Sequence, residues 1–542
     1  MLHTAYIGIG SNMESPGENC LQAIERLSTH SDLTLVTRSS LYQSEPFGIT
    51  DQDWFVNSVV RLTTPLTPEE VLQVCLSIEQ AMGRTRTEKW GPRIIDLDIL
   101  FYDDLILKQE GLEIPHPGIA ERSFVLAPMN EIAPQFIHPM LKKKIETLLA
   151  EIIFVLDGIH FALKHMKRWM KTQRREIDLT MHPGAKNRVI PQPLGVVGVI
   201  VPWNFPVQLG LTPLTYIFAA GNRAMIKPSE FTPTVSDVMA EVVRDAWDEK
   251  EVAIFTGGPE VGAAFSALPF DHMLFTGATS IARHIMAAAA KNLVPVTLEL
   301  GGKSPNVFFE SVMAEDDAFL DKAIEGLVLF AFNQGEVCTC PSRALIQESI
   351  YEEFMARCLK RVEAIKMGDP LDLGTMMGAQ ASNDQYEKIL NYIDVGKQEG
   401  AEVLIGGEAY ENEVYPNGLY IKPTIFKGHN KMRIFQEEIF GPVLSVTTFK
   451  DEAEAMEIAN DTLYGLGAGV WTRDVHQMQT FARGIQAGRI WCNCYHAYPA
   501  GASFGGYKKS GIGRENHKMM LGHYRHTKNV LMSYDKNPLG FF

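Results

Sequence analysis

Two stretches of the chain hold the residue types that chemistry requires, and the first is the run KWGPRIIDLDI at residues 89–99. Its alternating apolar residues predict a β-strand, and Asp96 and Asp98 stand two positions apart in it, so both carboxylates emerge on one face. Two converging carboxylates suit Mg²⁺. Cationic or ionisable side chains flank them at Arg84, Arg86, Lys89, Arg93, His116 and Arg122. Two acids at this spacing more often lie on the solvent-exposed face of a strand. Here the flanking cations would neutralise a polyphosphate, which favours nucleotide chemistry without a Walker phosphate-binding loop.

The second stretch centres on Cys338 in the run FNQGEVCTC. A thiolate nucleophile needs a donor for the oxyanion that it creates, and the Asn204 amide together with the Cys338 backbone N–H fits that task. It also needs a base for a later water, for which Glu299 is the candidate. An isolated Cys is usually a core residue and an isolated Glu a surface acid. Their joint order with the surrounding motifs predicts oxidation of an aldehyde.

Aldehyde oxidation needs a hydride acceptor, and a parallel sheet offers a dinucleotide site at the carboxyl ends of its strands. Lys227 and Glu230 follow one predicted strand and are placed to bind the adenosine ribose hydroxyls. A carboxylate there repels a 2′-phosphate, so the sequence favours NAD over NADP.

The predicted helices and strands that must position these residues follow a different order in the two parts of the chain. Upstream, strands predicted at 4–9, 55–62 and 96–101 alternate with helices at 20–27 and 68–82, an α+β pattern. Downstream, an apolar strand, a Gly or Pro turn and a helix recur in that order, which predicts a parallel doubly wound sheet. Between them, residues 141–182 predict a helical junction whose basic run at 164–175 is best interpreted as a solvated helix face, with a polyanion site as the weaker alternative.

Composition limits the classes of protein that the chain can be. Its 542 residues allow three or four domains, and its 46% apolar content is that of a packed globular chain. A formal charge of −15 argues against a nucleic-acid partner. The chain has no apolar stretch long enough for a membrane span. It has only seven Cys residues, and together these features favour the reducing cytoplasm.

The first part resembles 6-hydroxymethyl-7,8-dihydropterin pyrophosphokinase of folate biosynthesis. The likeness rests on IGIGSN, SEPFG, FVN, GRTR, KWGPRIIDLDI and IPHPGIAERSFVLAP, and it covers residues 3–150. It implies an α+β ferredoxin-like fold and transfer of pyrophosphate from ATP to the pterin hydroxymethyl group. The implied roles are Mg²⁺ binding by Asp96 and Asp98, phosphate contacts by Arg84, Arg86 and Arg93, ATP binding by His116 and Arg122, and pterin binding by Asn57 and Phe124.

The remainder, from about residue 152 to the end, resembles the NAD(P)-dependent aldehyde dehydrogenase superfamily. The motifs are VPWNFP, KPSEFTP, FTGAT, TLELGGK, FNQGEVCTC, EEIFGPV and FGGYKKSGIGRE. The resemblance implies a thiohemiacetal on the nucleophile, hydride transfer and thioester hydrolysis. The implied residues are Cys338 as nucleophile, Glu299 as deacylation base, Asn204 as oxyanion amide, Trp203 and Gly277 as cofactor wall, and Glu438 and Phe440 as nicotinamide-ribose contacts.

Three departures from this second family stand out. Ala278 and Ala282 occupy positions where the family carries Ser and Gly near the cofactor phosphate, which predicts weaker cofactor binding. The helices expected before Asn204 are shortened at the N-terminal side. The sequence up to about residue 305 is most similar to coniferyl aldehyde dehydrogenases, whereas the sequence after it is most similar to the acetaldehyde-oxidising branch. The preferred aldehyde therefore stays open.

The predicted organisation follows from the two resemblances. The expected regions are a pyrophosphokinase-like domain at 1–150, an NAD-binding domain at 151–305, a catalytic thiol domain at 306–500 and an oligomerisation segment at 501–542. The expected partners are the small-molecule substrates and further copies of the chain, as a dimer or tetramer. Two interpretations remain: a bifunctional enzyme with ATP, Mg²⁺ and NAD as cofactors, or a composite chain in which only one site works and the other domain serves binding or oligomerisation.

Overall fold

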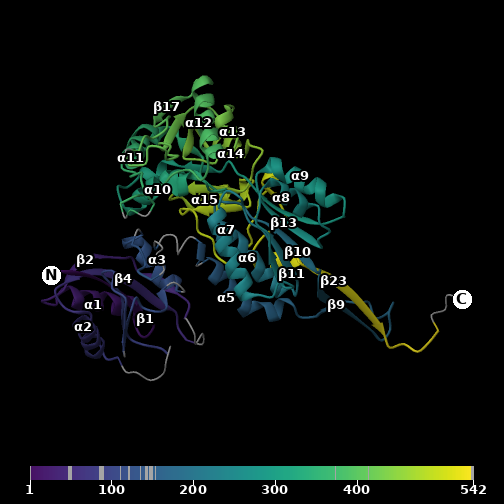
Figure 1. The fold of residues 1–542 in the computed structure, drawn as a ribbon, viewed down its shortest axis with the longest axis horizontal. Coiled ribbons are helices and arrows are strands. Elements are labelled where there is room, and N and C mark those ends of the chain that lie inside the picture. Colours follow the sequence, from purple (N-terminus) through teal and green to yellow (C-terminus); the bar gives the residue numbers. More distant parts are fainter. Residues whose placement is uncertain are drawn as a thin grey trace. The chain divides into compact units, whose positions relative to one another are not determined.

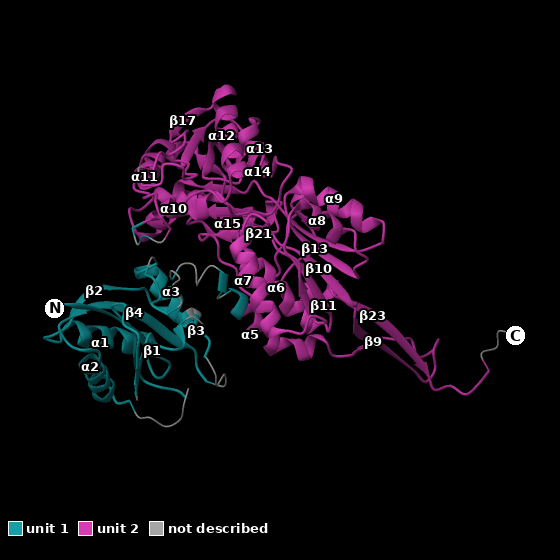
Figure 2. Ribbon diagram, viewed as in Figure 1, with its two compact units in different colours: residues 1–156, 371–374 teal, residues 157–370, 375–542 magenta. Residues whose placement is uncertain are grey.

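The structure is a computed structural model of the chain (Figure 1). It describes residues 2–46, 52–84, 91–109, 111–119, 122–134, 136–140, 145, 151–152, 154–370, 372, 374–412 and 414–538. The chain divides into a first unit of residues 1–156 with 371–374 and a second unit of residues 157–370 with 375–542 (Figure 2).

The first unit is built on an antiparallel sheet. Its strand order is β2-β4-β1-β5, with β3 also paired to β4. The bounds are β1 His3–Ser11, β2 Thr34–Arg38, β3 Tyr42–Ser44, β4 Phe55–Thr64 and β5 Asp96–Tyr102. A small hairpin of β6 (Leu107–Gln109) and β7 (Leu112–Ile114) follows.

Side-chain alternation along these strands explains how both faces of the sheet are covered. Ile7 and Ile9 lie in a core with α1 (Pro16–Ser28) and α2 (Pro68–Ala81), whereas Tyr6 lies in a second core with α3 (Ser123–Ile132). A capping box between Thr67 and Glu70 fixes the start of α2. The α+β prediction for this part of the chain is confirmed.

The second unit contains a first parallel sheet with strand order β12-β11-β10-β13-β14-β22. The bounds are β10 Val196–Ile200, β11 Arg223–Lys227, β12 Val252–Ile254, β13 His272–Gly277, β14 Val296–Leu300 and β22 Gly511–Ile512, the last being antiparallel to β14. Chain order runs outward from β10 to β12 on one side and resumes at β13 on the other. The carboxyl ends of β10 and β13 therefore form a topological switch point, where ligands of such sheets bind.

Helices cover both faces of this first parallel sheet. Val199 and Leu274 pack with α6 (Pro206–Ala219) and α7 (Pro233–Ala246) on one face. Met273 and Phe275 pack with α8 (Pro259–Ser266) and α9 (Thr279–Ala290) on the other. This is the doubly wound arrangement that the sequence predicts.

A second parallel sheet has the order β17-β18-β19-β16-β15-β20-β21. The bounds are β15 Pro305–Phe308, β16 Arg343–Gln347, β17 Glu402–Ile405, β18 Thr424–Lys427, β19 Val443–Phe449, β20 Gly467–Trp471 and β21 Arg489–Cys492; β17 alone runs antiparallel within the described strands. The helices around it are α10 Ala318–Val328, α11 Tyr351–Glu363, α12 Asn383–Gln398, α13 Arg433–Gln436, α14 Glu452–Asn460 and α15 Val475–Gly484.

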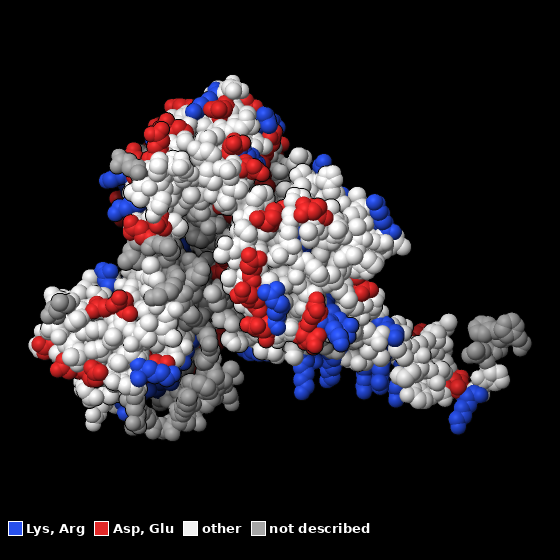
Figure 3. Space-filling model, in the orientation of Figure 1, with Lys and Arg blue, Asp and Glu red and all other residues white. Residues whose placement is uncertain are grey.

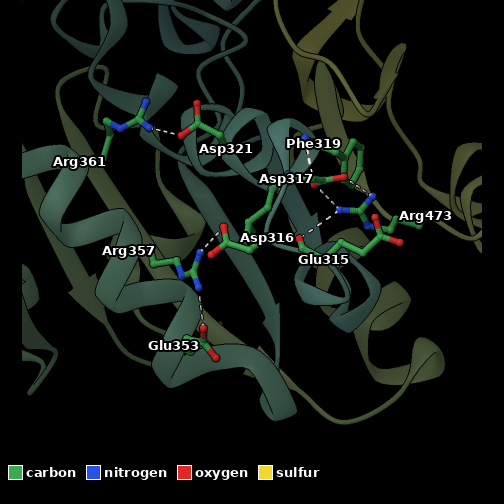
Figure 4. A network of polar contacts seen from close by, with 10 residues as sticks. Glu315, Asp316, Asp317, Phe319, Asp321, Glu353, Arg357, Arg361 and Arg473 are labelled. Carbon is green, nitrogen blue, oxygen red and sulfur yellow. Dashed lines mark hydrogen bonds and ion pairs between the residues drawn. The ribbon is translucent and has the colours of Figure 1, made fainter.

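Charged side chains attach α10 to its neighbours (Figure 4). Asp317 accepts hydrogen bonds from the backbone N–H groups of Phe319 and Leu320 at 3.1 Å each, which caps the helix. Arg473, just beyond β20, donates to the Asp317 carboxylate at 2.6 Å and covers the Phe319 ring. The hydrogen bond from Arg473 lowers the pKa of Asp317 to about 2. The cap of α10 is thereby held to the end of a strand that is distant in sequence.

A third sheet consists of β8 (Gln173–Arg175), β9 (Ala185–Pro193) and β23 (Arg525–Ser533), all antiparallel. In Figure 1 the paired β9 and β23 extend from the body of the second unit as a ribbon. The basic run at 164–175 begins in α5 (Phe154–Trp169) and ends in β8, with Lys164, Lys167 and Arg168 exposed. Figure 3 shows lysine and arginine side chains gathered along this edge. The solvated helix face is found only up to Trp169, because the run then leaves the helix and ends in the strand β8. Most of the junction at 141–153 lies outside the described residues.

Among the helices that the structure describes, none has both the length and the apolar composition needed to cross a membrane.

The interior of the second parallel sheet generates a stability prediction. Trp471 is 1% exposed, stacks on Phe308 and donates from Nε1 to Asn306 Oδ1 at 2.7 Å. We expect Trp471→Phe to lower the free energy of unfolding by about 1–3 kcal/mol, because a buried amide oxygen loses its donor. Urea unfolding followed by circular dichroism measures the loss. Trp247→Phe, at a half-buried position, is the matched control, and an equal loss in both variants would contradict the account.

Candidate active sites

The carboxylates of the first unit lie in one cross-strand row. On β5, Asp96 and Asp98 share a face, and Asp96 is paired in register with Gly10 of β1, which is paired in turn with Asn57 of β4. A Cβ on Gly10 would lie 3.2 Å from Asn57 Oδ1, so the missing side chain leaves room between the amide and the carboxylates. The sheet register thus brings together two predicted metal ligands and a predicted pterin ligand.

Arginine side chains surround Asp96. Arg84 donates to both Asp96 and Glu79, and Arg93 Nε lies 3.1 Å from Asp96 Oδ2. Glu79 is 4% exposed and also accepts a hydrogen bond from the Leu97 backbone at 2.8 Å, so it fixes both Arg84 and the start of β5. The sequence reasoning missed Glu79. An acid among the apolar residues on the buried face of α2 was the signal that could have found it.

The Asp98 side chain is 41% exposed, against 17% for Asp96, and it faces His116. Burial, with the charge of Asp96 as a second cause, raises the pKa of Asp98 to about 7. His116 Nε2 lies 4.0 Å from Asp98 Oδ2, and burial and the nearby Arg122 lower the pKa of His116 to about 4. The Arg122 guanidinium lies 5.9 Å from the Phe124 ring centroid. Arg86 and Lys89 fall outside the described residues.

In the second unit, the backbone around Cys338 is shaped by a tight loop. Residues 333–335 all have positive φ, and a Cβ on Gly335 would lie 2.1 Å from the Gly441 carbonyl oxygen. Asn204, just before α6, donates from Nδ2 to the Glu336 carbonyl at 3.0 Å. The predicted oxyanion amide is therefore fixed to the loop that carries the predicted nucleophile.

Two carboxylates, Glu299 and Glu438, lie close enough for their charges to act on this thiol, and a third lies beside Glu299. Glu299 stands on β14, and neither carboxylate oxygen has a hydrogen-bond partner among the described residues. Glu438 accepts from the Gly302 N–H at 2.9 Å, and a Cβ on Gly302 would lie 2.6 Å from the Cys338 carbonyl oxygen. Burial, followed by the charges of Glu438 and Glu299, raises the pKa of Cys338 to about 12. The predicted nucleophile and base are thus brought together in a desolvated site.

The third carboxylate, Glu515, ends the FGGYKKSGIGRE motif, and the sequence alone predicted no role for it. It is 6% exposed, its Oε1 has no partner in the described part of the chain, and burial raises its pKa to about 7. Burial and then the charge of Glu515 raise the pKa of Glu299 well above its usual range. Two neighbouring buried acids that repel each other's charge can share a proton. Its place in the run GRE, a few residues after FGG, was the only sequence signal.

The remaining predicted residues lie near the switch point of the first parallel sheet. Trp203 follows β10, and its ring meets that of Phe440 edge-on with centroids 5.3 Å apart. Lys227 ends β11, is 4% exposed and donates from Nζ to Glu230 at 2.5 Å. Gly277 ends β13, immediately before α9.

Two family models match the chain. The model described as "Aldehyde dehydrogenase family" matches residues 131–530. The chain belongs to the aldehyde dehydrogenase family. The model for 7,8-dihydro-6-hydroxymethylpterin-pyrophosphokinase matches residues 6–134, so the chain also contains a domain of that enzyme family, and both resemblances drawn from the motifs are confirmed.

Relatives of known sequence and structure agree with the aldehyde dehydrogenase assignment. The chain is 64% identical over 353 residues to an aldehyde dehydrogenase of Deinococcus radiodurans, covering 65% of this chain and 68% of the relative. It is 62% identical over 355 residues to acetaldehyde dehydrogenase 2 of Cupriavidus necator, covering 65% and 70%. The crystal structure of PnpE from Pseudomonas sp. WBC-3 superposes with a TM-score of 0.68 at 32% identity, covering 73% of this chain and 80% of that one. An aldehyde dehydrogenase of Mycobacterium tuberculosis complexed with NAD+ gives 0.65 at 34% identity, covering 72% and 78%.

The carboxylates around the thiol generate a reactivity prediction. In Glu438→Gln the amide keeps an acceptor for the Gly302 N–H but removes a charge that helps to raise the Cys338 pKa. The pKa of Cys338 should therefore fall and its thiolate fraction rise, so alkylation by iodoacetamide at pH 8–9 should accelerate by about two- to tenfold. Mass spectrometry of the Cys338 peptide measures the rate.

Glu437→Gln is the matched control, because the Glu437 carboxylate faces Arg433 instead, at 2.8 Å from its Nε. Equal acceleration in the two variants, or none in Glu438→Gln, would show that the Glu438 charge does not act on the thiol.

Proposed function

We propose that the second unit oxidises an aldehyde to a carboxylic acid with NAD as the acceptor. The observation that carries the proposal is the fixing of Asn204 Nδ2 to the Cys338 loop, with Glu299 buried close enough for its charge to act on that thiol. The names of the relatives, among them an acetaldehyde dehydrogenase and an NAD+ complex, support the same chemistry.

The residues of this unit divide the reaction among them. The Cys338 thiolate attacks the carbonyl carbon, and Asn204 Nδ2 with the Cys338 backbone N–H stabilises the oxyanion of the resulting thiohemiacetal. NAD supplies the site that accepts the hydride. Glu299 then takes a proton from the water that hydrolyses the thioester, and Glu515 is placed to share that proton. Because burial keeps the free thiol protonated, a carboxylate such as Glu299 is also the group available to accept its proton.

The residues at the switch point fit a dinucleotide. Glu230 would bind the adenosine ribose beside Lys227, and Trp203, Gly277, Glu438 and Phe440 would line the nicotinamide half. Ala278 caps α9 without a side-chain hydrogen bond, so the N–H groups at this helix end have no hydroxyl competing for them. Ala282 is 2% exposed and packs in the core, so it does not narrow the approach to the helix end. We infer that the two alanines weaken cofactor binding less than the sequence alone suggests.

For the first unit we propose Mg²⁺-dependent transfer of pyrophosphate from ATP to 6-hydroxymethyl-7,8-dihydropterin. Asp96 and Asp98 would hold the metal ions, and Arg84, Arg86 and Arg93 would neutralise the phosphates. His116 and Arg122 would bind ATP, while Asn57 and Phe124 would hold the pterin ring. The fit rests on the two carboxylates sharing a face of β5 with Arg84 and Arg93 already beside Asp96.

The joint activity of both units is the leading proposal, with cytoplasmic small molecules as substrates. The ribbon of β9 and β23 supports a homo-oligomer, dimer or tetramer, because long paired strands that extend from a domain offer an edge to a second copy. The alternative is that one unit serves only binding or assembly. Its support is the apolar surface of α7, where Val238 and Val242 are 53% and 47% exposed.

Removing the thiol tests the dehydrogenase unit. We expect Cys338→Ala to lower NADH formation from acetaldehyde or benzaldehyde by about 10³-fold or more, because the proposed nucleophile that forms the thiohemiacetal is lost. Cys358→Ala, on the buried face of α11, is the control for loss of a buried thiol. Undiminished NADH formation in Cys338→Ala would contradict the assignment of Cys338 as the nucleophile.

Removing a carboxylate tests the first unit in the same way. Asp96→Ala should lower AMP release from Mg-ATP and hydroxymethyl-dihydropterin by about 10²-fold or more, since a metal ligand and the partner of Arg84 are lost together. Asp104→Ala, an exposed acid just after β5, is the control. Chromatographic measurement of AMP decides the point, and full activity in Asp96→Ala would exclude the proposed site.

The cofactor preference has its own test. Glu230→Gln removes the charge that repels a 2′-phosphate, so the ratio of kcat/KM for NADP to that for NAD should rise by about tenfold. Asp237→Asn, on the exposed surface of α7, controls for the loss of one negative charge. An unchanged ratio would mean that Glu230 does not face the ribose.

A further inference from the structure

A short chain of hydrogen bonds leads away from the nucleophile through a wall of aromatic rings. Thr339, directly after Cys338, is hydrogen-bonded through Oγ1 to the Tyr498 hydroxyl at 2.6 Å. The same hydroxyl lies 3.1 Å from His496 Nδ1. The thiol is close enough for its charge to act on Tyr498, whose pKa is raised mainly by burial and then by Cys338. His496 is therefore linked to the nucleophile by one peptide bond and two hydrogen bonds.

The other ring nitrogen of His496 has no partner. Nε2 is buried and makes no hydrogen bond within the described residues. Burial lowers the pKa of His496 to about 4, so the ring is neutral at physiological pH and Nε2 is either a single donor or a single acceptor. A buried polar atom left without a partner costs free energy, and in a native structure such an atom calls for an explanation.

The backbone at His496 is also held in an unusual conformation. Its φ is +54°, in the left-handed region that residues other than glycine adopt uncommonly, and Asn493 has the same φ. The neighbouring loop fixes this geometry: Asn493 exchanges two hydrogen bonds with the Thr472 backbone, and Trp491 Nε1 donates to the Ala497 carbonyl at 2.8 Å. Strain that the surroundings maintain in this way is typical of ligand sites.

The rings around His496 describe the rest of the ligand. Phe332, in the loop that leads to Cys338, has its centroid 5.5 Å from that of His496 and is 40% exposed. Tyr495 meets the imidazole edge-on at 4.9 Å, and Trp491 lies at 6.1 Å. Such a wall suits the flat apolar body of an aromatic ring, with one polar atom at its end.

We propose that His496 binds the hydroxyl group of a phenolic aldehyde whose carbonyl carbon is held at Cys338. A hydroxyl both donates and accepts, so it satisfies Nε2 in either tautomer, which a carbonyl or an ether oxygen does not. Tyr498 orients the imidazole through Nδ1. This assignment names the substrate class of the dehydrogenase site and rests on the function proposed for that unit.

The decisive measurement compares 4-hydroxybenzaldehyde with benzaldehyde as a matched pair, in the full chain with NAD. We expect kcat/KM for the phenol to exceed that for benzaldehyde by about tenfold or more, which corresponds to about 1.4 kcal/mol. His496→Leu should reduce this ratio to near one, mainly through KM. Tyr498→Phe, which keeps the imidazole but removes the Nδ1 partner, should reduce it partially. His476→Leu, at an exposed position in the first turn of α15, should leave the ratio as it is.

A ratio near one in the unaltered chain overturns the proposal whatever the variants do, as does an undiminished ratio in a folded His496→Leu. The same pair is also measured by equilibrium dialysis with the Cys338→Ala chain, which binds without turnover. If no aldehyde yields NADH, the dehydrogenase proposal fails; tighter binding of the phenol that depends on His496 would then still support this inference, and equal binding of the two aldehydes would overturn it.

Discussion

The burial of ionisable groups around one thiol is the constraint on which the second unit depends. Glu299 is 4% exposed, whereas Glu438 and Cys338 are half-buried, and for each of the three groups loss of hydration is the first cause that raises the pKa. A desolvated site strengthens every charge that develops in it, which favours an oxyanion held by a fixed amide donor. The same desolvation disfavours the thiolate, so the reactive form must be created by proton transfer to a neighbouring group when substrate binds. In the proposed mechanism, Glu299 and Glu515 would share the proton that this transfer releases.

Such close placement of buried groups is possible only where the backbone carries no side chain. A Cβ on Gly301 would clash with the Glu438 carboxylate, and one on Gly505 would lie 2.8 Å from Glu299 Oε1. Gly335, with φ +72°, lets the thiol loop pass against the Gly441 carbonyl. The glycines in ELGG, FNQG and FGG are thus explained by the contact that each one permits. These contacts link segments of both parallel sheets into one site within the second unit.

Sequence reasoning found the residues whose roles are encoded locally. The two-residue spacing of Asp96 and Asp98 predicted their shared face on β5, and the strand, turn and helix order predicted the doubly wound sheet. It missed Glu79, Glu515 and the link from His496 to Thr339, because each depends on contacts between segments far apart in the chain. Periodicity cannot reveal that a buried acid on a helix fixes an arginine beyond its end. Nor can it reveal that a histidine 157 positions after Thr339 is linked to it by hydrogen bonds through the Tyr498 hydroxyl.

If the N-terminal side of the dehydrogenase is shortened, as the sequence predicts, the packing of the second unit indicates which part would be affected. The face of the first parallel sheet next to α6 is well covered: α5 contributes Trp169, 4% exposed, and α16 (His517–His523) contributes Leu521 to the same core. By contrast, α7 leaves Val238 and Val242, one turn apart, open to solvent. A missing helix would therefore expose α7 rather than the sheet or the thiol loop. Because α7 follows the strand and turn that carry Lys227 and Glu230, any loss of function from the shortened segment should appear first in cofactor binding, while the geometry of Cys338, Asn204 and Glu299 is retained.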